Sequence, residues 1–173
     1  MRQGAFPAPD EPPDAGGLQR LTGRAWTGGG FASPARAARE TAERLGVAAR
    51  ADEALRDIDH GAWTGRSFTE VQAAEPGAFA AWLADPAVGA PGGEGLAAVC
   101  ARVRPWLAAR AEAGGRTIAV THPMVVRAAV AAALDLPPPA VLRIDVAPLS
   151  TLTLSFNRVW RLQALQPDLG GLG

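Results

Sequence analysis

The chain has 173 residues, 48% of them hydrophobic, which suits one domain with a sizeable core. Its 17 basic and 17 acidic residues give a formal net charge of zero, which argues against a general binder of nucleic acids or membrane surfaces. The single cysteine, Cys100, excludes an intramolecular disulfide and a cysteine-rich zinc site, and we expect it to be buried. No apolar run approaches the roughly 20 residues of a membrane span. The first residues form no apolar signal segment, so we expect a cytoplasmic protein.

The N-terminal part of the chain carries few signals of regular structure. Residues 1–17 hold several prolines and glycines, which predicts a loop-rich N-terminus. A glycine run at 28–30 follows. We expect the first clear helix to begin at Ser33, with this serine as its N-cap and Pro34 in the first helical position, and to end at Gly46.

The middle of the chain predicts helices separated by turns. Ser67 and Glu70 have the spacing of a capping box, so we expect a helix over 68–74, followed by a helical piece at about 77–84. A turn then leads into a helix over 96–113, whose apolar residues recur at helical spacing.

The C-terminal third alternates between strand and helix signals. Residues 117–121 form the clearest buried strand, because they are β-branched and bounded by glycines. A helix over 124–134 follows directly. After three prolines, residues 141–146 and 150–156 are predicted strands, and the second pairs with 159–165 through a tight hairpin turn. This alternation predicts a layered α/β domain.

The strongest candidate for a functional residue is His122, which directly follows the strand at 117–121. A histidine at the C-terminal end of such a strand lies at the edge of an α/β sheet where ligands usually bind. The next helix points free N–H groups and its positive dipole end at the same place, which favours an anion such as phosphate. A histidine that only packs at the strand end would give the same local pattern.

Arg36 gives a second signal. It falls in the first turn of the helix after Ser33, where a guanidinium group can hold phosphate oxygens in a fork beside the helix N–H groups. A solvated surface arginine is the alternative interpretation.

The segment 47–63 gives a third signal but no clear period. We expect Leu55 and Ile58 to be buried. Asp57 and Asp59 face the same way if this stretch is extended, and one of them could donate a proton to a leaving oxygen.

Together with one turn, these segments resemble the histidine phosphatase (phosphoglycerate-mutase-like) superfamily. Four motifs of that family occur in the same order and at similar spacing over about residues 5–165. They are a Ser-Pro-x-x-Arg-Ala-x-x-Thr-Ala helix start at Ser33 to Ala42, a Leu-x-Glu-x-x-x-Gly-x-Trp-x-Gly segment at Leu55 to Gly65 with Asp57 in place of Glu, a Gly-Gly-Glu turn at Gly92 to Glu94, and a strand ending in Ser-His-Gly before a helix with an arginine, at Thr121-His122-Pro123 and Arg127. No single motif is highly specific, but the ordered set is.

The resemblance implies a fold and a set of site residues. It implies a single domain over 1–173, folded as a three-layer α/β/α sandwich around a mostly parallel mixed sheet, with residues 64–93 as a lid over the pocket. It implies that Arg36 and His122 bind phosphate, that Asp57 protonates the leaving oxygen, and that no metal or cofactor takes part. The expected partner is a small phosphorylated metabolite or another anion, without nucleic acid or membrane, and a homodimer is an option.

The family's nucleophile is the histidine of an Arg-His-Gly motif at the end of the first strand, and Arg2-Gln3-Gly4 is the only candidate for it here. Either Gln3 replaces the nucleophile or the chain begins after the motif. The family's downstream Asp-x-Pro-Leu-Thr-x-x-Gly segment fits Asp10 to Gly17, and Gln3 lies only seven residues before Asp10, so the spacing favours the second alternative. A glutamine amide is a poor nucleophile, and no phosphohistidine could form on it.

The first strand of the fold is then absent or replaced, which removes ladder partners from its neighbours. Three explanations stay open: a start inside a longer reading frame, a degenerate N-terminus, or another segment, such as Arg24 to Thr27 or a partner chain, in the gap. Two functions follow. One is a metal-independent phosphomonoesterase with an upstream Arg-His-Gly, and the other is an inactive phosphatase-like binding protein or an enzyme recruited to another reaction. We expect the negative charge of Glu94 to interact favourably with the positive end of the dipole of the next helix.

Overall fold

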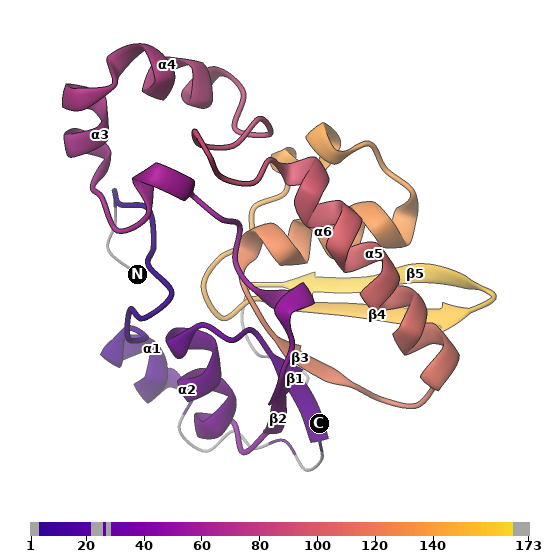
Figure 1. The fold of residues 1–173 in the computed structure, drawn as a ribbon. Coiled ribbons are helices and arrows are strands. Elements are labelled where there is room, and N and C mark those ends of the chain that lie inside the picture. Colours follow the sequence, from indigo (N-terminus) through magenta and orange to yellow (C-terminus); the bar gives the residue numbers. More distant parts are fainter. Residues whose placement is uncertain (1–3, 22–25, 27–28, 168–173) are drawn as a thin grey trace.

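The computed structural model describes residues 4–21, 26 and 29–167, which form an α/β fold (Figure 1). The helices are α1 (Ala15–Arg20), α2 (Arg36–Arg44), α3 (Phe68–Ala74), α4 (Pro76–Ala84), α5 (Leu96–Ala113) and α6 (Pro123–Leu134). The strands are β1 (Gly29–Ala32), β2 (Ala48–Ala51), β3 (Ile118–Val120), β4 (Thr151–Asn157) and β5 (Val159–Gln166). Short 3₁₀ helices η1 (Glu53–Leu55), η2 (Gly61–Trp63) and η3 (Pro138–Arg143) lie between them.

The described strands form two separate sheets. β1 lies between β2 and β3, and all three run parallel. β4 and β5 form an antiparallel hairpin, whose turn residue Arg158 has a φ of 64°. The predicted hairpin is therefore confirmed. The predicted single mixed sheet is wrong for the described strands, because among them the hairpin pairs with no strand of the parallel sheet.

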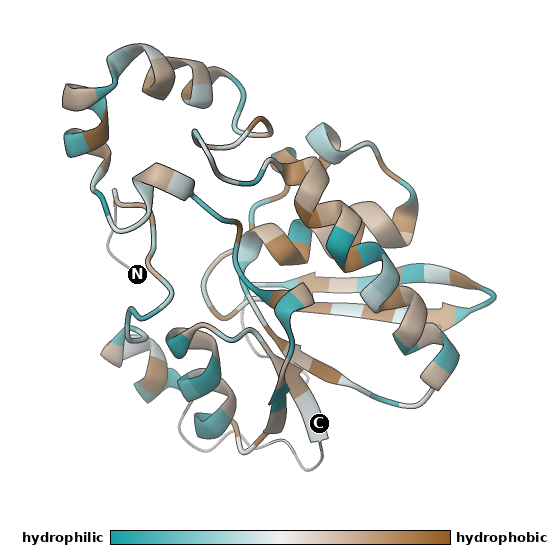
Figure 2. Cartoon of the chain, in the orientation of Figure 1, coloured by the Kyte–Doolittle hydropathy of each residue, from teal (hydrophilic) through white to brown (hydrophobic). Residues whose placement is uncertain are grey.

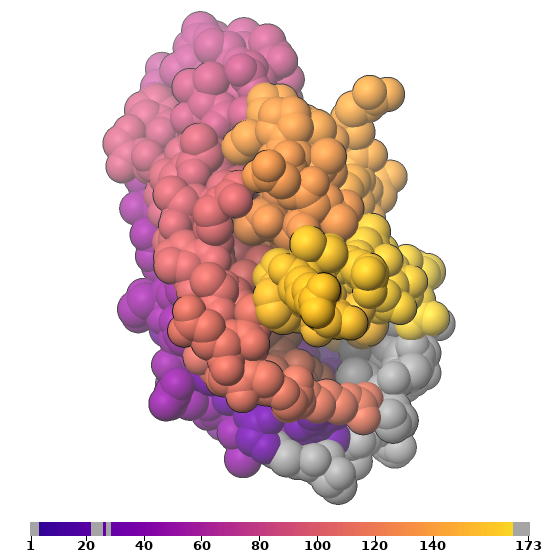
Figure 3. All heavy atoms as spheres, turned by 90° about the vertical axis from the view of Figure 1, so that its right-hand side faces the viewer, coloured from indigo at the N-terminus to yellow at the C-terminus, as the bar shows by residue number. Residues whose placement is uncertain are grey.

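Helices cover both faces of the parallel sheet. On β1, Phe31 packs into a core cluster with residues of α5 and α6, whereas Ala32 packs into another cluster with residues of α2. Leu152 and Leu154 of the hairpin join the α5 and α6 side. Accordingly, Figure 2 shows α2 as largely hydrophilic and α6 as mostly hydrophobic. In Figure 3 the hairpin forms a yellow ridge between the α6–η3 segment and the connection from α5 to β3.

β1 occupies part of the glycine run that gave no strand signal. A Cβ atom at Gly30 would lie 2.6 Å from Cγ2 of Ile118 and 2.7 Å from Cγ1 of Val47. Only glycine fits where these two side chains cross the backbone so closely. Gly29 and Gly30 are therefore packed strand positions.

Four of the predicted helices agree closely with the structure, among them α4, which begins one residue before the predicted piece at 77–84. α5 has the predicted bounds, and α6 begins one residue before the predicted start. α3 begins with the predicted capping box, in which Ser67 Oγ accepts a hydrogen bond from the Glu70 amide and the Glu70 carboxylate accepts one from the Ser67 amide. Cys100 is buried, as predicted.

Three other local predictions are wrong. α2 begins at Arg36 with Ala35 as its N-cap, so neither Ser33 nor Pro34 takes its predicted place. Residues 138–143 form a 3₁₀ helix where a strand over 141–146 was predicted. Prolines at the start of this helix have no N–H group to donate to a sheet. The predicted N-terminal loop also gives way to α1 at Ala15, because the Asp14 carboxylate caps that helix.

The segment from Gly61 to Ala90 forms a lobe with its own core, which stands apart from the sheet in Figure 1. The buried residues of this aromatic lobe are Phe6, Trp63, Val71, Phe79 and Ala90, with Phe6 supplied by the N-terminal segment. The lobe contains most of the predicted lid. Across the described part of the chain, no helix is both long enough and apolar enough to cross a membrane.

Candidate active site

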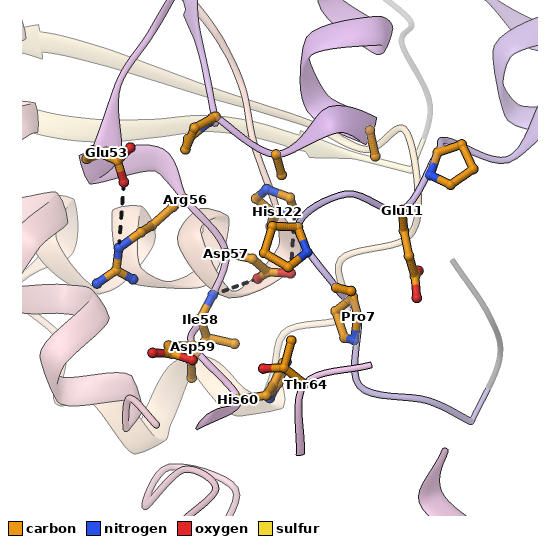
Figure 4. Close-up of a pocket in the computed structure, with 16 residues that line it drawn as sticks. Pro7, Glu11, Glu53, Arg56, Asp57, Ile58, Asp59, His60, Thr64 and His122 are labelled. Carbon is orange, nitrogen blue, oxygen red and sulfur yellow. Dashed lines mark hydrogen bonds and ion pairs between the residues drawn. The ribbon is translucent and has the colours of Figure 1, made fainter. Parts of the chain in front are cut away.

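A cavity of about 400 Å³ lies at the C-terminal ends of β1 and β3 (Figure 4). Its lining residues come from within 7–12, the start of α2, the loop 53–60, Thr64 and His122. Segments far apart in the sequence therefore meet at the sheet edge where parallel α/β proteins bind ligands.

His122 links two polar partners at this edge. It directly follows β3 and is the N-cap of α6. Its Nε2 lies 2.7 Å from Ser33 Oγ, and its Nδ1 lies 3.3 Å from Asp57 Oδ2 (Figure 4 shows the latter pair). We assign the proton to Nδ1, because a carboxylate only accepts, and the Ser33 hydroxyl then donates to Nε2.

The surroundings of His122 favour the neutral ring. Burial lowers the pKa of His122 below its ordinary value; the Asp57 carboxylate offsets part of this effect, and Arg102 adds to it. Because burial disfavours the charged form, the imidazole is neutral at neutral pH. An anion that enters the cavity would act on this pKa in the same direction as Asp57.

Ser33, His122 and Asp57 form a chain like that of serine hydrolases, in which a carboxylate orients an imidazole beside a hydroxyl. Ser33 is, however, 0% exposed and is not among the residues that line the cavity. A nucleophile has to reach its substrate. We therefore interpret Ser33 as the group that fixes the ring of His122.

Arg36 is not among the residues that line the cavity. Its Nε donates to Glu40 Oε1 at 2.6 Å along α2, and its side chain is half exposed. Its neighbours Ala35 and Ala37 do line the cavity, so Arg36 lies at the edge of the site. The structure thus brings Asp57 and His122 together, while Arg36 as a phosphate ligand stays a prediction.

Two further predictions concern segments outside the described residues. These are the replacement of the nucleophile by Gln3 and, apart from Trp26, a gap-filling role for Arg24 to Thr27.

The charge of the lining is mostly negative. Its carboxylates belong to Glu11, Glu53, Asp57 and Asp59, and among the described lining residues Arg56 alone has a guanidinium group. Glu94 already holds that group through two hydrogen bonds of 2.6 and 2.9 Å. The described lining therefore offers little free positive charge to a phosphate.

Sequence reasoning missed the roles of Ser33, Arg56, Glu94 and Arg102. Glu94 was predicted to favour the dipole of the next helix from its first turn, but α5 begins at Leu96, and Glu94 instead binds two arginines. The Gly-Gly-Glu motif was the only feature of the sequence that pointed to Glu94. No local pattern pointed to its partners Arg56 and Arg102, because they lie on other elements.

Comparison with known proteins agrees with the ordered motifs. Residues 17–166 match the model of the histidine phosphatase superfamily (branch 1). A glucosyl-3-phosphoglycerate phosphatase of Mycobacterium tuberculosis is 35% identical over 105 residues, which is 55% of this chain and 47% of that protein. The match thus spans about half the length of this curated relative.

Solved structures extend the similarity over most of the chain. A mycobacterial glucosyl-3-phosphoglycerate phosphatase in complex with inorganic phosphate is 28% identical, with a TM-score of 0.67, and the match covers 89% of this chain and 82% of that one. The α-ribazole phosphatase from Shigella flexneri shares the fold, with a TM-score of 0.81 at 17% identity over 96% of this chain and 91% of that one. Because the family model spans nearly the whole chain, this protein belongs to the histidine phosphatase superfamily, branch 1.

Proposed function

We propose that the cavity at His122 and Asp57 binds a phosphate monoester, which is hydrolysed with a nucleophilic histidine supplied from outside the 173-residue sequence. The observation that carries the proposal is the contact of these two side chains in a cavity at the ends of two parallel strands. The glucosyl-3-phosphoglycerate phosphatases among the similar proteins support a small phosphorylated metabolite as the substrate.

The phosphate would lie between the N-termini of α2 and α6. Neither helix has a side-chain cap, although the Arg36 amide donates to the Pro9 carbonyl oxygen at 2.9 Å and α6 begins with a proline. The other N–H groups of the two first turns and the helix dipoles favour an anion. The negative phosphate raises the proton affinity of His122, which then binds as an imidazolium. Arg36 exchanges the Glu40 carboxylate for a phosphate oxygen, because a half-exposed ion pair of this kind is weak.

The nucleophile has to come from elsewhere, because the chain contains only His60 and His122. Both ring nitrogens of His122 have partners, and the ring of His60 lies 5.1 Å from the ring of Phe6. We propose a histidine on an Arg-His-Gly strand, whose arginine also supplies the positive charge that the lining lacks. Its ring nitrogen attacks phosphorus as the bond to the leaving oxygen breaks, and Asp57, in its protonated carboxylic-acid form, gives its proton to that oxygen. Water then attacks the phosphohistidine, inorganic phosphate and the free histidine are released, and a proton of the water returns to Asp57.

The test compares the 173-residue chain with a chain lengthened by translating the DNA upstream of Met1 in frame. We expect only a lengthened chain with Arg-His-Gly to hydrolyse p-nitrophenyl phosphate. In that chain, Asp57→Asn lowers kcat on an alkyl phosphate by about 100-fold or more, because an alkoxide needs a proton to leave. The loss on p-nitrophenyl phosphate is much smaller, because nitrophenolate leaves without one.

The matched control is Asp135→Asn, at an αL position whose side chain is 90% exposed. It should leave both rates unchanged. An equal loss on the two esters in Asp57→Asn would contradict the acid role. Turnover by the 173-residue chain that is abolished in His122→Ala would contradict an external nucleophile.

The lack of free positive charge in the described lining, which would have to stabilise the transferred phosphoryl group, favours a second candidate, a phosphatase-like binding protein without phosphatase activity. This alternative predicts no turnover by either chain. It also predicts that calorimetric binding of phosphorylated metabolites is lost in His122→Ala and Arg36→Ala. Turnover by the lengthened chain would exclude it.

A further inference from the structure

We propose that Glu94 and Arg102 are positioning residues, which together hold the loop 52–59 so that the Asp57 carboxylate faces His122. The inference rests on the proposed function, in which Asp57 is the acid. It assigns a role to the Gly-Gly-Glu turn, which no step of that function uses.

Glu94 is the centre of a partly buried ion-pair network. Its carboxylate accepts hydrogen bonds from both terminal nitrogens of Arg56, at 2.6 and 2.9 Å, and from two nitrogens of Arg102, both at 3.1 Å. It also accepts the Asp59 amide at 3.1 Å. Five donors on one carboxylate, with both arginines engaged through two nitrogens, fix its orientation.

Arg102 connects this carboxylate to the backbone that carries Asp57. From α5 it donates to the carbonyl oxygen of Ala54 at 2.8 Å and to that of Asp57 itself at 3.0 Å. Thr121, which precedes His122, donates from Oγ1 to the Leu55 carbonyl at 2.7 Å. The loop is therefore tied both to α5 and to the end of β3.

The Gly-Gly-Glu turn touches the same loop through its backbone. A Cβ atom at Gly93 would lie 2.3 Å from the carbonyl oxygen of Asp59, and the Glu94 amide donates to that oxygen at 2.8 Å. A side chain at position 93 would separate the two segments. The glycine therefore allows the turn to come close enough to the loop for Glu94 to bind it.

The network stays charged over the range in which His122 titrates. Burial alone would raise the pKa of Glu94, but hydrogen bonds from Arg56, Arg102 and the Asp59 amide outweigh it and hold this pKa at about 2. Separating either arginine from this carboxylate would leave a partly buried charge without its partner, which costs free energy. The ion pairs therefore stay formed. The groups that hold the loop are thus charged in both forms of His122.

The contacts of Asp57 show how the network acts on the site. Its Oδ1 accepts the Ile58 amide at 2.8 Å, and its Oδ2 lies 3.3 Å from His122 Nδ1. Since Arg102 holds the carbonyl of the same residue, a shift of that backbone moves the carboxylate with it. A group that only stabilises the fold would not change the contact of Asp57 with His122.

The test follows the titration of His122 by NMR in the full chain, whose two histidines are assigned with His60→Gln. The charged groups that act on His122 are Asp57 and Arg102. We expect Glu94→Gln to lower the His122 midpoint as far as Asp57→Asn does. The double variant should have the midpoint of Asp57→Asn alone, because Glu94 acts through Asp57. An unchanged midpoint in Glu94→Gln, or effects that add in the double variant, would overturn the proposal.

Arg102→Lys serves as a second variant, because it keeps the charge and loses the bonds to the two carbonyl groups. If Glu94→Gln does not fold, as judged by near-UV circular dichroism, Arg102→Lys and its double variant with Asp57→Asn carry the same comparison. The matched control is Glu112→Gln, an exposed position of α5, which should leave the midpoint unchanged.

The outcome is separable from that of the proposed function. In an active lengthened chain, Glu94→Gln should lower kcat about 100-fold with little change in KM, the usual cost of a displacement of about 1 Å. A lengthened chain without activity, but with the expected His122 midpoints, rejects the phosphatase and retains the positioning role. A lengthened chain that is active, but whose His122 midpoint is unchanged by Glu94→Gln, supports the phosphatase and rejects the positioning role.

Discussion

The sheet and the aromatic lobe share the cavity, but they are built differently. The core cluster between the sheet and α5 and α6 is mostly aliphatic, with Phe31 as its one buried aromatic residue among those described. The lobe is held by contacts between aromatic rings, with Phe79 and Trp82 stacked 5.9 Å apart. The polar network that holds Asp57 belongs to the sheet side. The sheet side thus positions the reacting groups and supplies much of the cavity wall, to which the N-terminal segment adds residues 7–12 and the lobe adds Thr64.

The N-terminal segment connects the two parts. The ring of Phe6 lies 5.1 Å from those of His60 and Trp63, and residues 7–12 continue from it along the cavity. Backbone hydrogen bonds from Phe6 to Arg66 and from Gly65 to Phe6 fasten the segment to the lobe. The lobe and this segment should therefore respond together when either is weakened.

Trp63→Ala gives the largest expected effect and is the way to break the lobe without touching the site. Trp63 is fully buried, and its Nε1 donates to Glu75 at 3.0 Å. Removing such a side chain should lower the free energy of unfolding by about 3–5 kcal/mol. Urea denaturation followed by amide NMR should show that signals of α3 and α4 are lost before those of α5 and α6.

The His122 midpoint should not change in Trp63→Ala, since the ties of the Asp57 loop come from α5 and β3. If this variant shifted the midpoint as Asp57→Asn does, the two parts would be coupled, and the comparison would fail.

Lowering the pH should destabilise the sheet side before the aromatic lobe. Glu94 has a pKa of about 2 in the folded chain against an ordinary value of 4.5, so the unfolded chain binds the proton first. Its contribution, about 3 kcal/mol, is fully present above pH 4.5 and is lost as the pH falls towards 2. His122, whose pKa burial lowers, adds a loss that begins as the pH falls below its ordinary value of 6.5.

Urea denaturation at a series of pH values measures this dependence. In Glu94→Gln the slope between pH 4.5 and 2 should be markedly flatter. The loss that begins below pH 6.5 should become larger, because the expected lower midpoint of His122 widens its gap to the ordinary value. Equal slopes in the two proteins would show that the network does not stabilise the fold through the charge of Glu94.

Local patterns were enough to predict the elements of the sheet side that have strong periods. α5, α6 and the hairpin have such patterns, and the motif order placed Asp57 and His122 at one site. β1 and β2 could not be predicted in this way, because glycine and alanine favour strands poorly. Their strand form depends on tertiary packing, as the close contacts at Gly30 show.

The ties of the Asp57 loop were also beyond local patterns. Arg56 and Glu94 are 38 residues apart, and Arg102 lies in a helix whose apolar period gives no hint of a partly buried arginine. Ser33 was misassigned for a related reason: the sequence Ser-Pro is typical of a helix start, but a nearby imidazole competes for the hydroxyl. The hydrogen bonds of these polar side chains therefore depend on partners that are distant in the sequence.

Ser67→Ala gives the smallest expected effect and sharpens the comparison within the lobe. The Ser67 hydroxyl caps α3 by accepting the Glu70 amide at 3.2 Å. Its loss should cost about 1 kcal/mol, and Ser67→Thr should recover most of it, because threonine also caps helices. Since a cap acts on its own helix, hydrogen exchange should speed up in α3 and leave α5 unchanged. Faster exchange in both helices would mean that the two cores unfold as one unit.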